Sequence, residues 1–211
     1  EYEAKYPNTF RVIDKENGNY GSCVNRGLKE ASGKYIKILD ADDWFDTKSF
    51  ENFISCIANI DADLILSDFS EVDATGRICK IHKYYTNDNK KIDECPSLSD
   101  MWMHAVTYKV ENLRDIGYTQ TEGISYTDQE WIFHPMVKVN SIYCFNQSLY
   151  QYLVGREGQT VDIHVWHKNM SHEIKTLKHR IALFESLIDY GNAEKYLRFR
   201  LVGIALLVYK R

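Results

Sequence analysis

Several features that would narrow the class of this protein are missing from its sequence. The 211 residues contain no apolar run near the roughly 20 residues that a membrane-spanning helix needs, and the longest late run covers only residues 201–209. No signal-peptide pattern opens the chain. The five cysteines are scattered and never form a C-x-x-C pair, which argues against a disulfide framework or a zinc site and suits a reducing cytosol. Internal repeats and low-complexity segments are also absent.

The chain has no excess of basic residues either. Its formal net charge is -4, whereas a nucleic-acid binder normally shows a basic face, so we expect no nucleic-acid partner. The charge is uneven, because residues 168–211 hold 9 Lys and Arg against 4 Asp and Glu. This basic tail is either a solvated helix face or a contact for an anionic membrane surface or an acidic partner. The expected location is the cytoplasm, at the inner face of the membrane if the tail makes that contact.

Short apolar stretches alternate with helical periodicity over the first third of the chain. The stretches that read as strands are residues 10–13, 35–39 and 64–66. A turn at residues 18–21 leads into a helix that Gly33 is expected to cap. A second helix is expected from about Thr47, with Asp46 as its N-terminal cap. This alternation predicts a layered α/β domain whose sheet is partly parallel and flanked by helices.

The rest of the chain gives weaker signals before its helical end. The expected elements are a hairpin turn at 74–76, a polar loop at 87–91, a helix at about 128–139, strands at 141–145 and 149–153, and helices at 166–190 and 193–209. Gly191 separates the last two helices. We therefore divide the chain into an α/β domain of residues 1–165 and a helical extension of residues 166–211.

Four carboxylates crowd into residues 40–46, directly behind the second apolar stretch. In an open α/β sheet, ligands bind beyond the carboxyl ends of the strands. Carboxylates this close repel one another unless a cation sits among them, and oxygen ligands favour Mg²⁺ or Mn²⁺ over zinc or copper. Asp40, Asp42 and Asp43 therefore predict a site for such an ion and a bound diphosphate. A second D-A-D triplet at residues 61–63 precedes a strand, which predicts a surface turn at the opposite edge of the sheet.

Residues 15–43 carry a longer pattern than an isolated D-x-D pair, and they read KENGNYGSCVNRGLKEASGKYIKILDADD. This segment resembles the donor-binding half of family 2 glycosyltransferases, which have the GT-A fold. The resemblance implies a Rossmann-like domain with a mixed, mostly parallel central sheet flanked by helices. It also implies that Asn25 lies on the donor side, that Asp40 contacts the nucleotide, and that Asp42 binds the divalent ion holding the sugar-nucleotide diphosphate.

A later stretch, SYTDQEW, resembles the acidic motif of the same family. The resemblance implies that Asp128 is the base that takes the proton of the acceptor hydroxyl, with Glu130 as the trailing acid. Asp128 could also cap the following helix, and the two roles are compatible. Arg156, in a segment similar to the part of the family that closes over the donor, either meets the diphosphate or is a solvated arginine. His104 falls where family members often place acceptor-side residues.

Two features of the family pattern do not occur in this sequence. Members open with a strand of the type V-S-V-I-I-P-x-Y-N and carry a further acidic motif that binds the base and ribose. We therefore expect the chain to lack the first βα units of the complete domain, about forty to sixty residues. A sheet edge exposed in this way would favour pairing with a second chain, such as a dimer, and weak or no sugar transfer by the chain alone.

The leading hypothesis is an inverting, metal-dependent glycosyltransferase of bacterial glycan synthesis. Its donor would be a nucleotide sugar, with a UDP-sugar favoured, and its acceptor a hydroxyl of a glycan or lipid-linked glycan. Two alternatives stay open: a non-catalytic glycan- or nucleotide-binding module of the same fold, and a sugar-phosphate nucleotidyltransferase. The latter would carry an early Gly-rich phosphate loop, which the sequence does not show.

Overall fold

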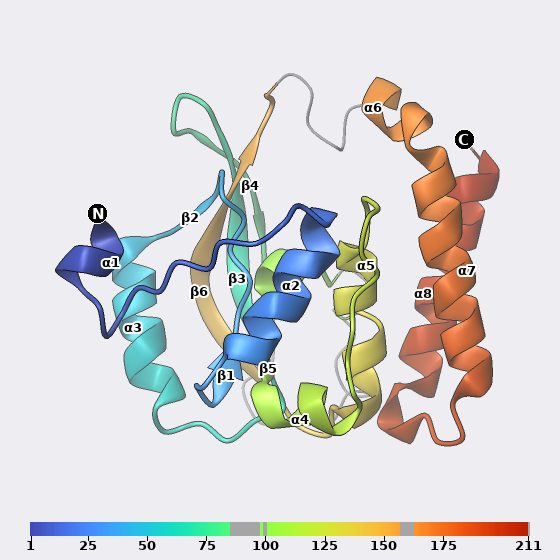
Figure 1. Ribbon diagram of the computed structural model, residues 1–211, viewed down its shortest axis with the longest axis horizontal. Helices are drawn as coiled ribbons and strands as arrows, with labels where there is room; N and C mark the ends of the chain where they lie inside the picture. The colour runs from blue at the N-terminus through green and yellow to red at the C-terminus, as the bar shows by residue number, and fades with distance from the viewer. Residues whose placement is uncertain (85–97, 99–100, 157–162, 211) are drawn as a thin grey trace.

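The computed structural model describes residues 1–84, 98, 101–156 and 163–210 (Figure 1). The polar loop expected at residues 87–91, and the part of the donor-side loop at residues 157–160, lie outside the described residues. The helices and strands follow in the order α1 (Tyr2–Lys5), α2 (Asn19–Glu30), β1 (Tyr35–Ile36), β2 (Trp44–Phe45), α3 (Thr47–Ile57), β3 (Leu64–Asp73), β4 (Ile78–His82), η3 (Met103–Ala105), β5 (Val106–Lys109), α4 (Val110–Asp115), α5 (Asp128–Trp131), η4 (His134–Lys138), β6 (Ile142–Val154), α6 (Ile163–Lys168), α7 (Met170–Ser186), η5 (Gly191–Ala193) and α8 (Glu194–Lys210).

The six strands form one mixed sheet in the order β1-β5-β3-β6-β2, with β4 on the outer half of β3. β3 and β6 run parallel along their whole length, with a register shift around Asp68. The other described pairings are antiparallel: β1 with β5, β5 with β3, β3 with β4, and β2 with β6. The mixed α/β sheet is confirmed, but its parallel part is smaller than the sequence suggested, because short strands flank the long β3–β6 pair on both sides.

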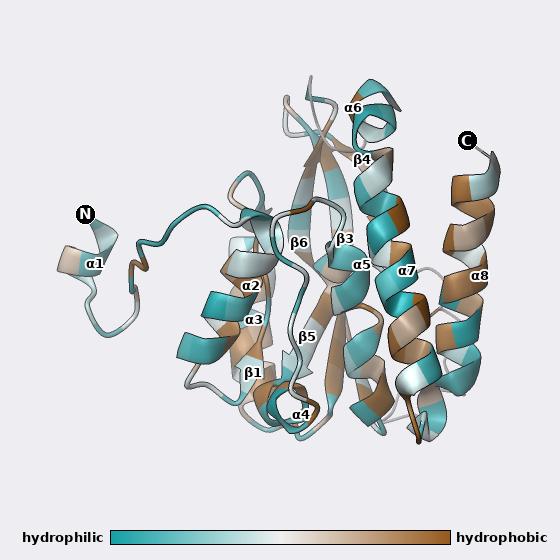
Figure 2. Ribbon diagram, turned by 45° about the vertical axis from the view of Figure 1, so that its right-hand side comes forward, coloured by the Kyte–Doolittle hydropathy of each residue, from teal (hydrophilic) through white to brown (hydrophobic). Residues whose placement is uncertain are grey.

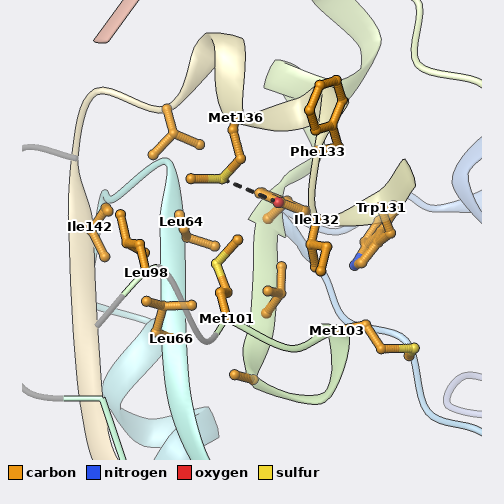
Figure 3. Close-up of a cluster of buried hydrophobic side chains, with 14 of the residues drawn as sticks. Leu64, Leu66, Leu98, Met101, Met103, Trp131, Ile132, Phe133, Met136 and Ile142 are labelled. Carbon is orange, nitrogen blue, oxygen red and sulfur yellow. Dashed lines mark hydrogen bonds between the residues drawn. The ribbon is translucent and has the colours of Figure 1, made fainter. Parts of the chain in front are cut away.

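Hydrophobic packing on both faces of the sheet places β3 at the centre. Leu64 and Leu66 belong to the larger core, which also holds residues from α2, α5 and η4. Figure 3 shows this core between β3, β6 and the segment that follows α5. Ile65 points to the opposite face, where Phe53 of α3 and Phe145 of β6 pack against it. Alternate side chains of a strand face opposite sides of a sheet, so the buried run of β3 supplies both cores.

The two helices expected early in the chain are confirmed, and one of their caps is as predicted. Asp46 caps α3, because its Oδ1 accepts the backbone N–H of Ser49 at 2.8 Å. α2 ends differently from the expectation. The helix stops at Glu30, and the backbone of Ala31 is already extended, so Gly33 is not a left-handed cap.

The C-terminal helices pack on the same core as the sheet. Phe184 of α7 and Leu197 of α8 belong to the larger core, and Tyr196 donates its hydroxyl to the carbonyl of Ile132 at 2.6 Å. α7 and α8 lie side by side at one flank of the molecule (Figure 1). Among the described helices, none is long and apolar enough to cross a lipid bilayer. The division of the chain at residue 165 remains a prediction.

Two expected elements differ from the structure. Residues 10–13 form no strand: no other strand pairs with them, and Phe10 and Val12 are 46% and 70% exposed. The helix expected at 128–139 is divided into α5 and η4, because Pro135 lacks the N–H that a continuous helix requires.

Two other expectations place the right elements with different lengths. The run 35–39 contributes only the two-residue β1, an edge strand. The two strands expected near the end of the sheet form the single long strand β6. The hairpin turn at residues 74–76 connects β3 to β4 as expected.

Candidate functional site

A pocket of about 830 Å³ opens where the loop after β1, η3, the segment before α5 and the end of β6 meet the C-terminal helices. It gathers five residues singled out from the sequence: Asp40, Asp42, His104, Asp128 and Arg156. They come from four chain segments between residues 40 and 156. The loop that follows β1 therefore meets other residues for which a functional role was predicted.

Two residues that line the pocket have unusual backbone conformations. Asn19 and Tyr126 have positive φ angles of 64° and 63°. Asparagine tolerates this region, but a tyrosine there is strained, and such strain concentrates at functional sites. The backbone N–H of Ser125 donates to Nδ1 of His172 in α7 at 3.2 Å, which ties this strained turn to the C-terminal helices.

The acidic cluster is held in place by Tyr150 of β6. The backbone N–H of Asp40 donates to the Tyr150 hydroxyl at 3.1 Å, and that hydroxyl donates to Oδ2 of Asp43 at 2.6 Å. The backbone N–H of Leu153 donates to Oδ1 of Asp43 at 2.8 Å. Burial, followed by the neighbouring charges of Asp43 and Asp128, raises the pKa of Asp40 to about 6. Negative charge is thus concentrated where no described cation neutralises Asp40.

His104 completes a group of metal-type ligands with these acids. One ligand atom each from Asp40, Asp43 and His104 lie within 4.8 Å of one another. The imidazole is 6% exposed and stacks on Tyr152 with ring centres 4.4 Å apart. Its Nδ1 is buried and has no hydrogen-bond partner. Burial, and then the charge of Lys37, lower the pKa of His104 to about 3, so the ring is neutral and its lone pair is available.

Asp42, the metal ligand predicted from the motif, lies in the same pocket but outside that three-residue group. Its Oδ2 forms an ion pair with Nη2 of Arg156, which reaches across from the end of β6. Both side chains are partly exposed. The structure therefore brings the two predicted donor-side residues together, with their charges paired.

Asp128 begins α5 and faces the pocket. Burial raises the pKa of Asp128, and the nearby charge of Arg180 opposes that rise. Nε2 of Gln129 donates to its Oδ2 at 3.2 Å. A carboxylate with a raised pKa in a pocket is the type of group that serves as a general base.

The C-terminal helices bring charged residues to this pocket that no sequence motif had indicated. Glu173 of α7 and Arg200 of α8 line it. Arg180 lies behind them at 2% exposure, with Nη2 3.8 Å from Oε1 of Glu173 and without a hydrogen-bond partner for that nitrogen. The basic excess of residues 168–211 was the only available signal, and it does not distinguish these buried charges from surface ones.

Asn25 and Glu130 lie outside the pocket lining. Asn25 donates to the carbonyl of Gln120 at 2.9 Å and accepts the N–H of that residue at 2.8 Å. Glu130 accepts the N–H and hydroxyl of Thr121 at 2.7 and 2.8 Å. Both side chains fasten residues 120–122, the segment leading to α5, onto the surrounding helices. Their predicted roles toward a donor or acceptor remain predictions.

The second D-A-D triplet lies at the other edge of the sheet, as expected. Asp63 accepts the backbone N–H groups of Asn140 and Ser141 at 2.9 and 3.0 Å. Asp61 is exposed and pairs with Lys34 and Lys109. Because lysines and backbone donors surround these acids, they do not form a second site of the kind found after β1.

Comparisons with known proteins identify the family and the fold of this chain. A sequence model of the family described as Glycosyl transferase family 2 matches residues 1–117, more than half of the chain. A Mycoplasma pneumoniae protein described as an uncharacterized glycosyltransferase, MG060 homolog, is 26% identical over 193 residues, covering 87% of this chain and 62% of that protein. The glycosyltransferase GlyA of Streptococcus pneumoniae is 28% identical over 193 residues, covering 83% of this chain and 26% of GlyA.

Similarity to solved structures extends to the fold. The crystal structure of S. aureus TarS 1-349 in complex with UDP-GlcNAc matches with a TM-score of 0.63 at 16% identity, covering 85% of this chain and 53% of that chain. At such a low identity the match shows only a shared fold, and that fold is the GT-A glycosyltransferase fold. The chain thus spans less than two thirds of each of these proteins. From its family match and its fold, this chain belongs to glycosyl transferase family 2.

Proposed function

We propose that the chain carries the transfer site of an inverting, metal-dependent glycosyltransferase that uses a nucleotide sugar, with a UDP-sugar as donor. The acceptor is a hydroxyl of a glycan or lipid-linked glycan in bacterial glycan synthesis, at the cytoplasmic face of the membrane. The observation that carries the proposal is the shared pocket. It places the acidic cluster around Asp40 and the candidate base Asp128 on one cavity large enough for two substrates.

The residues around Asp40 fit a divalent ion. Asp40, Asp43 and His104 offer two carboxylates and a neutral imidazole within 4.8 Å, and the buried Nδ1 of His104 has no other partner. Nitrogen among carboxylates suits Mn²⁺ better than Mg²⁺, which prefers oxygen ligands alone. Asp42 remains the ligand that the family motif predicts, and release from Arg156 would free it. When bound, the ion would offset the negative charge that develops on the leaving diphosphate.

The donor half of the pocket has the groups that a sugar nucleotide requires. Asn19, Asp40, Asp42 and Arg156 line it together. The guanidinium of Arg156 can pair with phosphate oxygens in place of the Asp42 carboxylate. A TarS structure of the same fold is in complex with UDP-GlcNAc and another with UDP, which supports a uridine nucleotide here.

Asp128 supplies the base on the acceptor side. In the transfer, its carboxylate takes the proton of the acceptor hydroxyl while the hydroxyl oxygen forms a bond to the anomeric carbon. The bond from that carbon to the diphosphate breaks, and the nucleoside diphosphate leaves with the electron pair. Attack opposite to the leaving group inverts the anomeric carbon. Trp102 and Tyr126 line the same pocket as Asp128, and their rings suit stacking on a sugar.

Calorimetric titration of the 211-residue chain with UDP, with Mn²⁺ or with EDTA, tests the donor and metal site. We expect binding that requires Mn²⁺. His104→Ala should weaken Mn²⁺ binding at least about tenfold, the lower bound for losing even a supporting group of a metal site. His82→Ala is the matched control, because His82 is similarly buried, at 5% exposed, and contacts Glu71 and Phe69 outside the group formed by Asp40, Asp43 and His104.

Equal UDP binding in EDTA, or an equal loss in the His82 variant, would contradict the metal site. Glycan binding that is indifferent to metal would instead indicate a non-catalytic module.

Asp128→Asn separates the base from the donor site. It should keep Mn²⁺-dependent UDP binding but lower transfer by roughly 10²- to 10⁴-fold in a chain that transfers sugar. A variant with unchanged transfer would remove Asp128 from the mechanism.

A further inference from the structure

The outer face of α8 carries a continuous apolar stripe with no described partner. Phe199, Val202, Leu206 and Tyr209 are spaced by three or four residues, which places them on one side of the helix. They are 52%, 58%, 49% and 88% exposed. In Figure 2, α8 lies at one edge of the molecule, with hydrophobic residues along most of its length. Contiguous exposed apolar patches of this kind mark interaction surfaces.

Packing among the residues that the structure describes does not account for this stripe. The opposite side of α8 supplies the internal contacts, through Tyr196 and Leu197 in the larger core. Arg200 and Ile204 line the candidate transfer pocket. Leu207 both lines the pocket and is 39% exposed, so it lies where the pocket rim meets the outer face. α8 therefore has one side in the fold, one side on the pocket, and one apolar side turned outward.

Exposed basic residues lie on α8 and on the neighbouring helix α7. Lys195 lies one turn before Phe199 on the same side and is exposed. Lys175 and Lys178 are exposed on the neighbouring helix α7. Arg198 is also exposed, but it pairs with Glu194, so the two together add no net charge to this surface. Among the described residues of 168–209, five basic side chains (Lys168, Lys175, Lys178, Lys195 and Arg198) and three acidic ones (Glu185, Asp189 and Glu194) are exposed. Residues 1–167, by contrast, carry 17 basic and 26 acidic side chains.

The difference in charge between the C-terminal helices and the rest of the chain favours one occupant of this surface over another. A second copy of the chain would bring another basic helix pair against the first, which is repulsive. An anionic lipid surface attracts the basic helix pair and repels the acidic remainder of the chain. Both the attraction and the repulsion favour the orientation in which α8 faces the membrane. Aromatic side chains such as Phe199 and Tyr209 also suit the boundary between headgroups and acyl chains.

We propose that the outer face of α8, defined by Phe199, Val202, Leu206 and Tyr209, docks on an anionic lipid bilayer. The helix lies along the surface with these side chains among the acyl chain boundaries and Lys195 at the headgroups. Docking brings the Leu207 rim of the pocket to the bilayer. On the proposed function, on which this last consequence rests, the acceptor hydroxyl then belongs to a lipid-linked molecule held at that surface.

Vesicle sedimentation with the 211-residue chain tests the docking without requiring sugar transfer, so it fails or succeeds independently of the proposed enzymatic function. Sucrose-loaded vesicles of phosphatidylcholine alone are compared with vesicles containing 30% phosphatidylglycerol, a composition chosen at about the anionic content of a bacterial membrane. We expect binding to the anionic vesicles only, weakened by high salt. The double variant Phe199→Ser and Leu206→Ser should lower the partition coefficient roughly a hundredfold, about tenfold for each side chain.

The matched control is the double variant Ile78→Ser and Ile81→Ser on β4. These isoleucines are 53% and 45% exposed, which matches Phe199 and Leu206, but they lie on the sheet. The control should bind like the unmodified chain. Lys195→Glu, which keeps the apolar stripe, should lower binding to anionic vesicles severalfold.

Three results would overturn the proposal. The first is an unmodified chain that does not sediment with anionic vesicles. The second is a Phe199 and Leu206 variant that binds as well as the control on β4. The third is a dimer, seen by light scattering, that this variant dissociates, because a second copy of the chain would then cover the face.

Discussion

Replacing Arg180 with methionine should destabilise the protein strongly, and more at neutral than at acidic pH. Arg180 is 2% exposed and Glu173 is 4% exposed, and their ion pair spans 3.8 Å. Removing one partner of a buried pair leaves an uncompensated charge, which costs about 3–5 kcal/mol. In a chain of this size each kcal/mol lowers the melting temperature by about 2–4 °C, so we expect a fall of roughly 6–20 °C at pH 7.

The pH dependence follows from the carboxylates that Arg180 faces. Burial raises the pKa of Glu173 and of Asp128, and Arg180 opposes both rises. Without the arginine, the pKa of each group in the folded protein rises further above its unfolded value. The unfolded state then binds fewer protons than the folded state over this range, so the stability of Arg180→Met falls as pH rises from about 5 to 7. The unmodified chain should show a smaller slope.

Thermal melting followed by circular dichroism at pH 5 and pH 7 measures both effects. Arg198→Met is the matched control, because Arg198 pairs with Glu194 at 2.9 Å but both side chains are at least half exposed. Such surface pairs contribute about 0–1 kcal/mol, so the control should melt within a few degrees of the unmodified chain. Adding Glu173→Gln to Arg180→Met should recover about 1–3 kcal/mol. A variant that melts like the control, or that shows no steeper pH slope, would refute this account of the buried charges.

Three further predictions concern the parts of the fold that position the pocket. In urea unfolding, Gly21→Ala should destabilise the protein by more than about 1 kcal/mol, because an added Cβ would lie 2.0 Å from the carbonyl oxygen of Thr121. Gly27→Ala in the same helix is the control. Its added Cβ would have no neighbour within 4 Å, so this variant should be neutral or stabilising. Asn25→Ala should cost about 1–3 kcal/mol, since it leaves buried backbone groups without partners; an unchanged urea midpoint would show that water replaces the side chain. Burial lowers the pKa of Lys37 to about 7, below its unfolded value, so stability should rise from pH 7 toward pH 10 in the unmodified chain. Lys37→Met should flatten that rise, and an equal slope in both proteins would contradict it.

The local elements and the acidic motif were predictable because their signals are local. The start of α3 needs only Asp46 and the residues of the first turn, and the sequence around it contains both. The place of Asp40 and Asp42 follows from their position in the loop that leaves β1, which ends at Ile36. The family pattern of residues 15–43 rests on the same contiguous stretch. A local pattern alone did not suffice for the strand expected at residues 10–13, because a strand also needs a neighbour to pair with, and none of the described strands pairs with these residues.

The role of each side chain within the site depended on contacts between distant segments. His104 approaches Asp40 and Asp43 because β5, β3 and β6 are neighbours in the sheet, an order that no local pattern specifies. The burial of Arg180 depends on how α7 packs on the core, and the sequence showed only one more cation in a basic region.

By itself, then, the amino-acid sequence determined the family, the alternation of helices and strands, and the acidic segment at which a diphosphate and its ion are expected. Only the tertiary structure decided that a neutral histidine joins those acids, that Asp42 pairs with Arg156, and that the C-terminal helices supply the counter-charge to Asp128. The physical reason is the range of the interactions. Propensity, capping and motif spacing act over a few residues, whereas burial, pKa and ion pairing arise from segments that meet only when the sheet and its helices have assembled.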